Sequence, residues 1–244
     1  YTTTHVWTMV PQGSEVVAVA SGQMTTCRLA NGTLRTVLFG GIDTNGTRHS
    51  ATLYFDASAA TPVFEQYIED VHVPLPERAL HNMVREGTKI YVLNGEDEAD
   101  TLLNDVWEFD TQTEKWREIH LDHSWSPRFG ASVESLGGIV YIYGGEADAL
   151  EITEDLWVLD PARSEATLVE SETDESDSPG LRAYHVMVEQ GNVLVVGLGL
   201  KDVHPYRYAT GWYGFDTTTQ MWSELTVTGT PPSNRYGASA VQVN

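Results

Sequence analysis

Cysteine is almost absent from this sequence. Cys27 is the single cysteine among 244 residues, so neither an intramolecular disulfide nor a cysteine-based zinc cage can form. This scarcity fits a reducing compartment, and we predict a cytoplasmic location for the chain.

Basic residues are also scarce. Lys and Arg number 14 against 35 Asp and Glu, which gives a formal net charge of −21 at pH 7. Such a surface repels phosphate groups and anionic lipid headgroups, so nucleic-acid binding is disfavoured and a basic partner is easier to reconcile with the charge. The longest apolar runs, such as VLVVGLGL, are too short to span a bilayer, and we expect no membrane insertion.

No stretch sustains a helical period of 3.6 residues; instead, a short apolar run that ends in glycine occurs four times. The four copies are TVLFGG, IYVLNG, VYIYGG and VLVVGLG, which end at Gly41, Gly95, Gly145 and Gly199. The second copy has Asn94 in place of the first glycine, and in the fourth Leu198 separates two glycines. Regular spacing of about 50 residues is typical of repeat architectures.

Three further landmarks keep the same order and spacing. Aromatic segments end in aspartate at Asp56, Asp110, Asp160 and Asp216. A tryptophan follows two of these aspartates, as Trp116 and Trp222. The segments PERALH, PRFGAS, GLRAYH and NRYGAS carry Arg78, Arg128, Arg182 and Arg235. Four landmarks in a constant order predict four copies of one structural unit.

Each unit divides into four β segments. The apolar run before the glycines suits a strand that is covered on both faces. Glycine then allows backbone conformations that other residues avoid, and each terminal aspartate can begin a turn by accepting backbone N–H bonds. A four-stranded antiparallel unit of this size cannot bury both faces alone, whereas several units stacked around an axis can. The sequence therefore predicts a β-propeller.

The glycine pair, the aspartate-ended aromatic strand, the spaced tryptophan and the PR-x-G segment resemble the kelch repeat. The resemblance covers the whole chain and implies an all-β, kelch-type β-propeller with four complete four-stranded blades, at residues 20–70, 76–121, 127–170 and 180–226. In the first blade Phe64 stands near the tryptophan position, and in the third Ala166 or Leu168 does. We expect residues 1–244 to form a single propeller domain.

The two ends of the sequence predict one additional strand each. By the resemblance, residues 5–13 form an outer d strand and NRYGASAVQV near the C-terminus forms an inner a strand. The four blades are then part of a longer ring of six or seven blades. The alternative is a five-bladed ring with one degenerate blade.

The arginines and the loops between the second and third strands are expected on one face of the propeller. That face includes the acidic segments 96–100, 146–155 and 171–180. The candidate partner-binding residues are Arg78, Arg128, Arg182 and Arg235, with Tyr184 and Tyr236 as aromatic neighbours. In the functional interpretation, the arginines receive an acidic or phosphorylated peptide, or the acidic rim receives a basic partner. In the structural interpretation, each arginine pairs with a carboxylate and links neighbouring blades.

The sequence offers little support for catalysis or cofactor binding. His120, Asp122 and His123 have metal-binding side chains, but no further ligand is evident and we predict no metal. The glycines lead from strand to strand and not into a helix, which excludes a phosphate loop. The resemblance implies a non-enzymatic protein-interaction module with no cofactor. The alternatives are a metal-dependent or oxidase-type enzyme with a central site, or an architectural subunit of a larger assembly.

Overall fold

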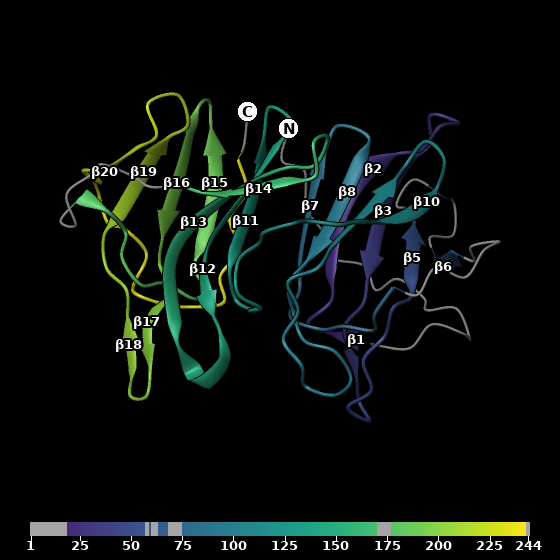
Figure 1. Cartoon of the computed structure of the whole chain (residues 1–244), viewed down its shortest axis with the longest axis horizontal. Helices are drawn as coiled ribbons and strands as arrows, with labels where there is room; N and C mark the ends of the chain where they lie inside the picture. Colours follow the sequence, from purple (N-terminus) through teal and green to yellow (C-terminus); the bar gives the residue numbers. More distant parts are fainter. Residues whose placement is uncertain (1–18, 57–58, 60–62, 68–74, 170–176, 243–244) are drawn as a thin grey trace, which may run out of the picture.

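The computed structural model describes residues 19–56, 59, 63–67, 75–169 and 177–242. The d strand predicted for residues 5–13 and most of the acidic loop 171–180 lie outside these residues. Where the chain is described, its regular structure is almost entirely β-strand (Figure 1).

Four antiparallel sheets of four strands each follow the chain in order, and we number them blades 1 to 4. Blade 1 contains β2 (Gln23–Arg28), β3 (Leu34–Phe39), β5 (Thr52–Phe55) and β6 (Phe64–Tyr67). Blade 2 contains β7 (Asn82–Glu86), β8 (Lys89–Leu93), β9 (Val106–Asp110) and β10 (Lys115–Ile119). Blade 3 contains β11 (Ser132–Leu136), β12 (Ile139–Glu146), β13 (Ile152–Asp160) and β14 (Glu165–Leu168). Blade 4 contains β15 (Val186–Gln190), β16 (Val193–Gly197), β19 (Trp212–Asp216) and β20 (Met221–Glu224).

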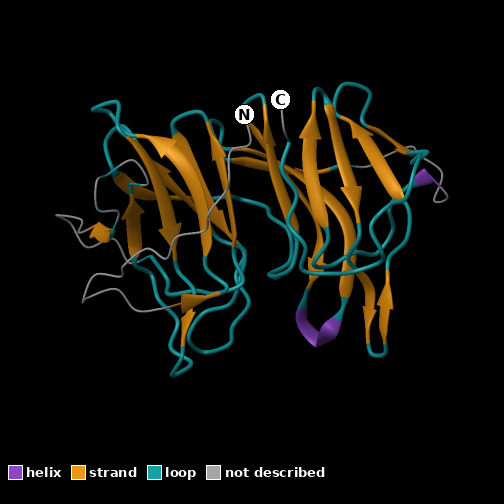
Figure 2. Cartoon of the chain, turned by 180° about the vertical axis from the view of Figure 1, so that it is seen from behind, coloured by secondary structure: helices purple, strands orange, loops and turns teal. Residues whose placement is uncertain are grey.

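Shorter elements project from one end of these sheets. The two-stranded ribbon of β17 (Leu200–Val203) and β18 (Tyr206–Tyr208) forms the connection in the chain between the second and third strands of blade 4. The 3-10 turn η1 (Asp148–Leu150) occupies the same place in blade 3, and β1 (Val19–Ala20) pairs with β4 (Ile42–Asp43) beside blade 1. Figure 2 shows η1 and the β17–β18 ribbon projecting at the same end.

The first strand of each blade lies toward the centre. Neighbouring inner strands β2, β7, β11 and β15 contact one another and line a central cavity of about 450 Å³. Side chains link them: Asn82 Nδ2 donates to the Ala131 carbonyl at 2.8 Å, and Ser132 Oγ donates to the His185 carbonyl at 2.7 Å. This radial arrangement confirms the predicted all-β propeller with four complete blades.

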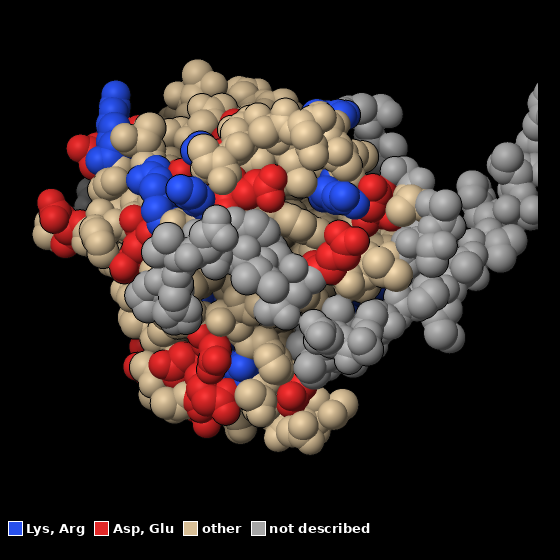
Figure 3. All heavy atoms as spheres, turned by 90° about the vertical axis from the view of Figure 1, so that its right-hand side faces the viewer, with Lys and Arg blue, Asp and Glu red and all other residues tan. Residues whose placement is uncertain are grey.

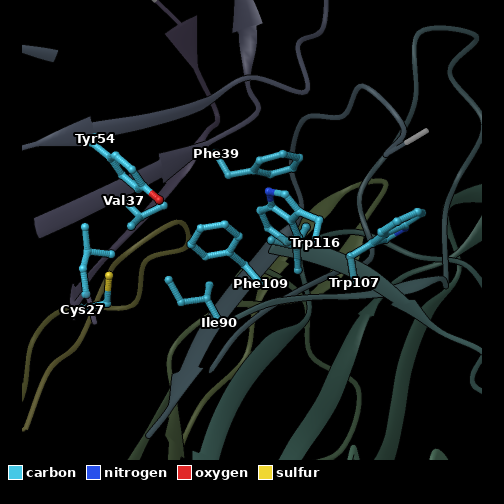
Figure 4. Packing of buried hydrophobic residues seen from close by; sticks show 10 residues of the cluster. Cys27, Val37, Phe39, Tyr54, Ile90, Trp107, Phe109 and Trp116 are labelled. Atoms are coloured by element: carbon cyan, nitrogen blue, oxygen red, sulfur yellow. The ribbon is translucent and has the colours of Figure 1, made fainter. Parts of the chain in front are cut away.

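The hydrophobic core consists of layers between neighbouring blades. Between blades 1 and 2, the rings of Phe39 and Trp116 lie 5.2 Å apart, and Cys27, Ile90 and Phe109 pack around them (Figure 4). Similar buried layers lie between blades 2 and 3 and between blades 3 and 4. The apolar runs before the glycines are buried, because sheets cover both of their faces, as predicted.

The glycine motif lies where the backbones of adjacent blades come closest. A Cβ on Gly144 would lie 2.3 Å from the carbonyl oxygen of Arg182 in the next blade. Leu198 is not an insertion, because its φ of 63° matches the φ of 60° at Gly144 and it occupies the same motif position. In blade 3 the chain does not leave the sheet at the glycines; β12 and β13 continue past them after a bulge.

The predicted aspartate turns are confirmed where the chain is described. The Oδ1 atom of Asp110 accepts the backbone N–H of Gln112 at 2.8 Å, and Asp216 accepts that of Thr218 at the same distance. Asp160 accepts the N–H of Ala162 at 3.1 Å. These side-chain acceptors begin the turn from the third strand to the fourth.

Residues 234–242 lie beside blade 4 but contain no strand. The Arg235 carbonyl accepts the N–H of Gly199, and Gly237 donates to the Tyr184 carbonyl at 2.9 Å, so the segment follows the path of an inner strand. The inner strand predicted here is thus present as a path of the backbone but not as a paired strand.

Candidate partner-binding face

One end of the propeller carries both the arginine segments and the loops between second and third strands. The residue after each arginine bridges the residue after the glycine motif of its own blade: Ala79 with Glu96, Phe129 with Glu146, and Ala183 with Leu200. We call this end the loop face. It lies at the bottom of Figure 1, where β17 and β18 project.

Three of the four predicted arginines are buried beneath the loop face. Arg78 is completely buried, and its two terminal nitrogens donate to the two carboxylate oxygens of Asp105 at 2.8 and 2.6 Å. Arg128 makes the same bidentate contact with Asp155 at 2.6 and 2.9 Å. The indole nitrogen of the tryptophan two residues later, Trp157, donates to the same Asp155 carboxylate. These guanidinium groups are already occupied by groups of their own blades.

Arg182 is equally buried but has a different set of partners. Blade 4 has Gly211 at the position of Asp105 and Asp155, so no carboxylate is available there. Arg182 instead donates to the carbonyls of Thr210 and Leu198, and its guanidinium carbon lies 5.2 Å from the centre of the Tyr213 ring. Burial without a carboxylate lowers the pKa of Arg182.

The side chains of these arginines stabilise single blades, whereas their backbones link adjacent blades. The second glycine-motif residue of each blade donates its N–H to the arginine carbonyl of the next blade, at 2.8 to 2.9 Å. The four pairs are Gly41 with Arg78, Gly95 with Arg128, Gly145 with Arg182, and Gly199 with Arg235. Direct contact of the buried arginines with a partner stays a prediction. The structure gives each of them a role in positioning the loop face.

The other three predicted residues lie at the surface and include two aromatic neighbours. Arg235 is exposed, and within the described part of the chain its guanidinium donates to the carbonyl and hydroxyl of Ser233. Tyr184 is partly buried, and its ring centre lies 6.1 Å from that of Tyr236, which is 47% exposed. The structure therefore brings the rings of Tyr184 and Tyr236 together.

Two tyrosines of the β17–β18 ribbon, which the sequence analysis did not single out, complete an aromatic patch. The Tyr206 ring stacks on Tyr236 at 5.9 Å with an interplanar angle of 19°, and Tyr208 lies 6.3 Å from the same ring. Tyr206 is 64% exposed and Tyr208 is 42% exposed. We call Tyr184, Tyr206, Tyr208 and Tyr236 the tyrosine patch. In the sequence, only the close spacing of the two tyrosines in YRY (206–208) could have indicated this patch.

Tyr184 is anchored by a buried carboxylate. Its hydroxyl donates to Glu146 at 2.7 Å, and Glu146 is 4% exposed. Burial and the neighbouring Glu146 raise the pKa of Tyr184, so the phenol stays protonated. Tyr184 also has a φ of 53°, at the repeat position where the segment before blade 3 has Gly130 and the C-terminal segment has Gly237. A bulky residue in this conformation is uncommon and is held here by its surroundings.

The acidic loop after β8 has a defined structure. In the loop after β8, Asp97 accepts two backbone N–H groups at 2.9 Å, from Ala99 and Thr101. Arg48 from blade 1 reaches into this loop and pairs with Glu96 and with Asp100. Figure 3 shows acidic side chains gathered at the lower end of one side of the molecule, where the loop face lies.

The candidate catalytic and metal-binding residues do not assemble. Across the described ranges, no group of three His, Cys, Asp or Glu side chains is placed to hold a metal ion. His120 is exposed beside Glu118, and Cys27 is buried in the core between blades 1 and 2. Burial lowers the pKa of His81 and of His185 to about 3, so both repeat-related histidines are neutral.

Comparison with known proteins identifies the family. The model of the KLHDC2/KLHL20/DRC7 Kelch-repeats domain matches residues 23–244. The chain belongs to the kelch-repeat family. The predicted resemblance is thereby confirmed, and kelch propellers generally mediate protein–protein interactions.

Several curated kelch relatives align with this chain. Adagio-like protein 1 of Oryza sativa subsp. japonica is 28% identical over 233 residues, which are 87% of this chain and 36% of that protein. An F-box/kelch-repeat protein of Arabidopsis thaliana is 34% identical over 140 residues, 51% of this chain and 28% of that protein. Tip elongation aberrant protein 1 of Schizosaccharomyces pombe is 34% identical over 103 residues, 41% of this chain and 9% of that protein. The chain thus spans little more than a third of these relatives at most. Among the residues that the structure describes, no helix is long and apolar enough to cross a membrane.

Proposed function

We propose that this kelch propeller is a non-enzymatic interaction module that binds a protein partner on its loop face. The observation that carries the proposal is the tyrosine patch. Three tyrosines are each more than two-fifths exposed and gather within ring-contact distance on a face built from rigid sheets. Exposed aromatic clusters of this kind are typical of protein-binding surfaces.

The buried arginines support this surface from below. Arg128 and Arg182 hold the ends of the loops through carbonyl and carboxylate contacts, so the loops need little ordering when a partner binds. Of the two partner chemistries considered, a basic partner is the better supported, because three of the four guanidinium groups that would receive an acidic peptide, those of Arg78, Arg128 and Arg182, are enclosed. A cytoplasmic location stays a prediction.

Affinity capture with matched surface variants tests the proposal. The double variant Tyr206→Ser/Tyr236→Ser removes aromatic area from the loop face, and Met221→Ser removes a comparably exposed side chain near the opposite end of blade 4. We expect the partners captured by the unmodified chain to be lost with the tyrosine variant and retained with the Met221 variant. Loss with the Met221 variant alone would place the partner away from the loop face and favour the architectural alternative.

A further inference from the structure

Two neighbouring blade junctions carry equivalent glutamates, but among the residues that the structure describes a basic side chain pairs with only one of these glutamates. Glu96 and Glu146 occupy equivalent positions, since each follows the glycine motif and bridges the residue after its blade's arginine. At the first junction, Arg48 of blade 1 pairs with Glu96 of blade 2. In blade 1 the residue after the glycine motif, Ile42, forms a β-bridge with Arg48. In blade 2 the equivalent residue, Glu96, forms a β-bridge with Leu102, so Leu102 occupies the position that Arg48 has in blade 1. Blade 2 therefore supplies no arginine to Glu146 of blade 3.

Glu146 instead contacts the hydroxyl of an aromatic residue, Tyr184. Within the described part of the chain, no Lys or Arg nitrogen is within ion-pair distance of its carboxylate, and its polar side-chain contact is the Tyr184 hydroxyl at 2.7 Å. A buried carboxylate without a cation is unusual, because burial of an unpaired charge is costly. The Glu146 carboxylate lies next to Tyr184, whose ring in turn contacts the exposed ring of Tyr236 at 6.1 Å.

No cation–π contact joins the exposed tyrosines to a basic side chain of the described ranges. The cation–π contact found among the described residues is that of Arg182 with Tyr213, on a different part of blade 4. Arg207, between the two ribbon tyrosines in sequence, is paired with Asp202 at 3.2 Å. The patch thus combines electron-rich ring faces with a nearby carboxylate, and no basic side chain in the described part of the chain stacks on these rings or pairs with this carboxylate.

We propose that the tyrosine patch and Glu146 form a subsite for a basic side chain, lysine or arginine, of the partner protein. The cation stacks on Tyr206 and Tyr236, while Glu146 supplies negative potential through Tyr184. Aromatic faces next to carboxylates are a recurring receptor for ammonium and guanidinium groups. The chain's net charge of −21 attracts such a partner. This inference rests on the proposed use of the loop face and names the chemistry of the ligand there.

Peptide binding to the 244-residue chain tests the subsite. The probes are three fluorescein-labelled peptides of one length that alternate glycine with arginine, with lysine, or with citrulline, the uncharged counterpart of arginine; binding is followed by fluorescence anisotropy. We expect Tyr206→Leu/Tyr236→Leu to weaken binding of the better cationic peptide about tenfold, and Tyr206→Phe/Tyr236→Phe to change it less than about threefold, because the rings remain. Equal binding of the citrulline peptide, or no effect of the leucine variant, would overturn the inference.

A second pair of variants separates local charge from the general acidity of the chain. Glu146→Gln and Glu165→Gln remove one negative charge each, and Glu165 is exposed on the outer strand β14. We expect about a fivefold loss with Glu146→Gln and no change beyond about twofold with Glu165→Gln. Equal losses in the two variants would show non-specific attraction and reject the subsite. If the peptides fail while captured partners still depend on Tyr206 and Tyr236, the subsite is rejected and the loop-face function stands.

Discussion

The backbone amide of Gly145 donates a hydrogen bond of 2.8 Å to the carbonyl of Arg182, so the glycine motif of blade 3 is joined to the arginine segment of blade 4. The same bond occurs between each of the other consecutive pairs of repeats in the described chain. The glycine motif and the arginine segment of the next repeat are thus the donor and the acceptor of one recurring hydrogen bond. That contact sets the distance between blades and the position of the loop face.

The close approach of blades predicts a strong effect of adding one methyl group at Gly144. A Cβ there would lie 2.3 Å from the Arg182 carbonyl oxygen, so Gly144→Ala should lower the free energy of unfolding by about 3 kcal/mol. Gly137 has a similar positive φ of 65° with nothing within 4 Å of an added Cβ, and Gly137→Ala should cost about 1 kcal/mol. Urea unfolding of both variants measures the difference. Equal losses would mean that only the backbone conformation matters at Gly144.

The buried Arg128–Asp155 pair predicts a large loss on truncation of the arginine. Arg128→Ala leaves the Asp155 carboxylate without its bidentate partner and should lower the free energy of unfolding by about 3–5 kcal/mol. Arg235 is exposed and, among the described residues, donates to Ser233, so Arg235→Ala should change it by less than about 0.5 kcal/mol. Thermal unfolding monitored by tryptophan fluorescence compares the two. An Arg128 variant as stable as the unmodified chain would disprove the structural role.

The neutral histidines predict a loss of stability on acidification. Their pKa of about 3 in the folded chain lies below the ordinary value of 6.5, so unfolding takes up protons between these values. Stability from this source is complete above pH 6.5 and declines as the pH falls toward 3; at pH 5 each histidine should account for a loss of about 2 kcal/mol. Burial lowers both pKa values most, and the positive charges of Arg78 beside His81 and of Arg182 beside His185 lower them further; these effects set the pH range of the loss.

Substitution by alanine isolates this pH dependence. Ala131 occupies the position of His81 and His185 in blade 3, which shows that the repeat accommodates alanine there. His81→Ala/His185→Ala should flatten the decline of unfolding free energy between pH 7 and pH 5, whereas exposed His120→Ala should not. An unchanged pH slope in the double variant would assign the acid sensitivity to other groups.

Asn94 predicts that restoring the glycine motif of blade 2 is harmful. Asn94 tolerates its φ of 62°, and its carboxamide accepts the indole N–H of Trp125 at 2.6 Å and donates to Asn82 at 2.9 Å. Asn94→Gly relieves the backbone but leaves the buried indole N–H unpaired, and it should lower the free energy of unfolding by about 1–3 kcal/mol. Trp125→Phe removes the unpaired donor, so the loss from Asn94→Gly should shrink in that background. Chemical unfolding of the unmodified chain, the two single variants and the double variant gives the coupling energy between Asn94 and Trp125. Additive losses of unfolding free energy would contradict the proposed hydrogen-bond dependence.

Much of the loop face was predictable and part of it was not. The spacing of Arg128 and Gly145 placed both at the ends of their strands on one face, because strand direction alternates regularly within each blade. A carboxylate partner for Arg128 was one of the two interpretations of the sequence. That the partner is Asp155 of the same blade could not be predicted, since this residue is 27 positions away and reaches Arg128 only when β13 lies beside β12. Trp125 and the β17–β18 tyrosines were overlooked because they belong to single loops and do not recur.

The sequence alone determined the architecture of this protein. Repeated glycine, aspartate, tryptophan and arginine positions specify strands, turns and their order, because each acts through local backbone conformation or through its neighbour in the repeat. The tertiary structure alone decided which side chains are enclosed and which face the solvent. Arg78 and Arg182 are covered while Tyr206 and Tyr236 meet at the surface, since these contacts join residues that only the packing of separate loops brings together.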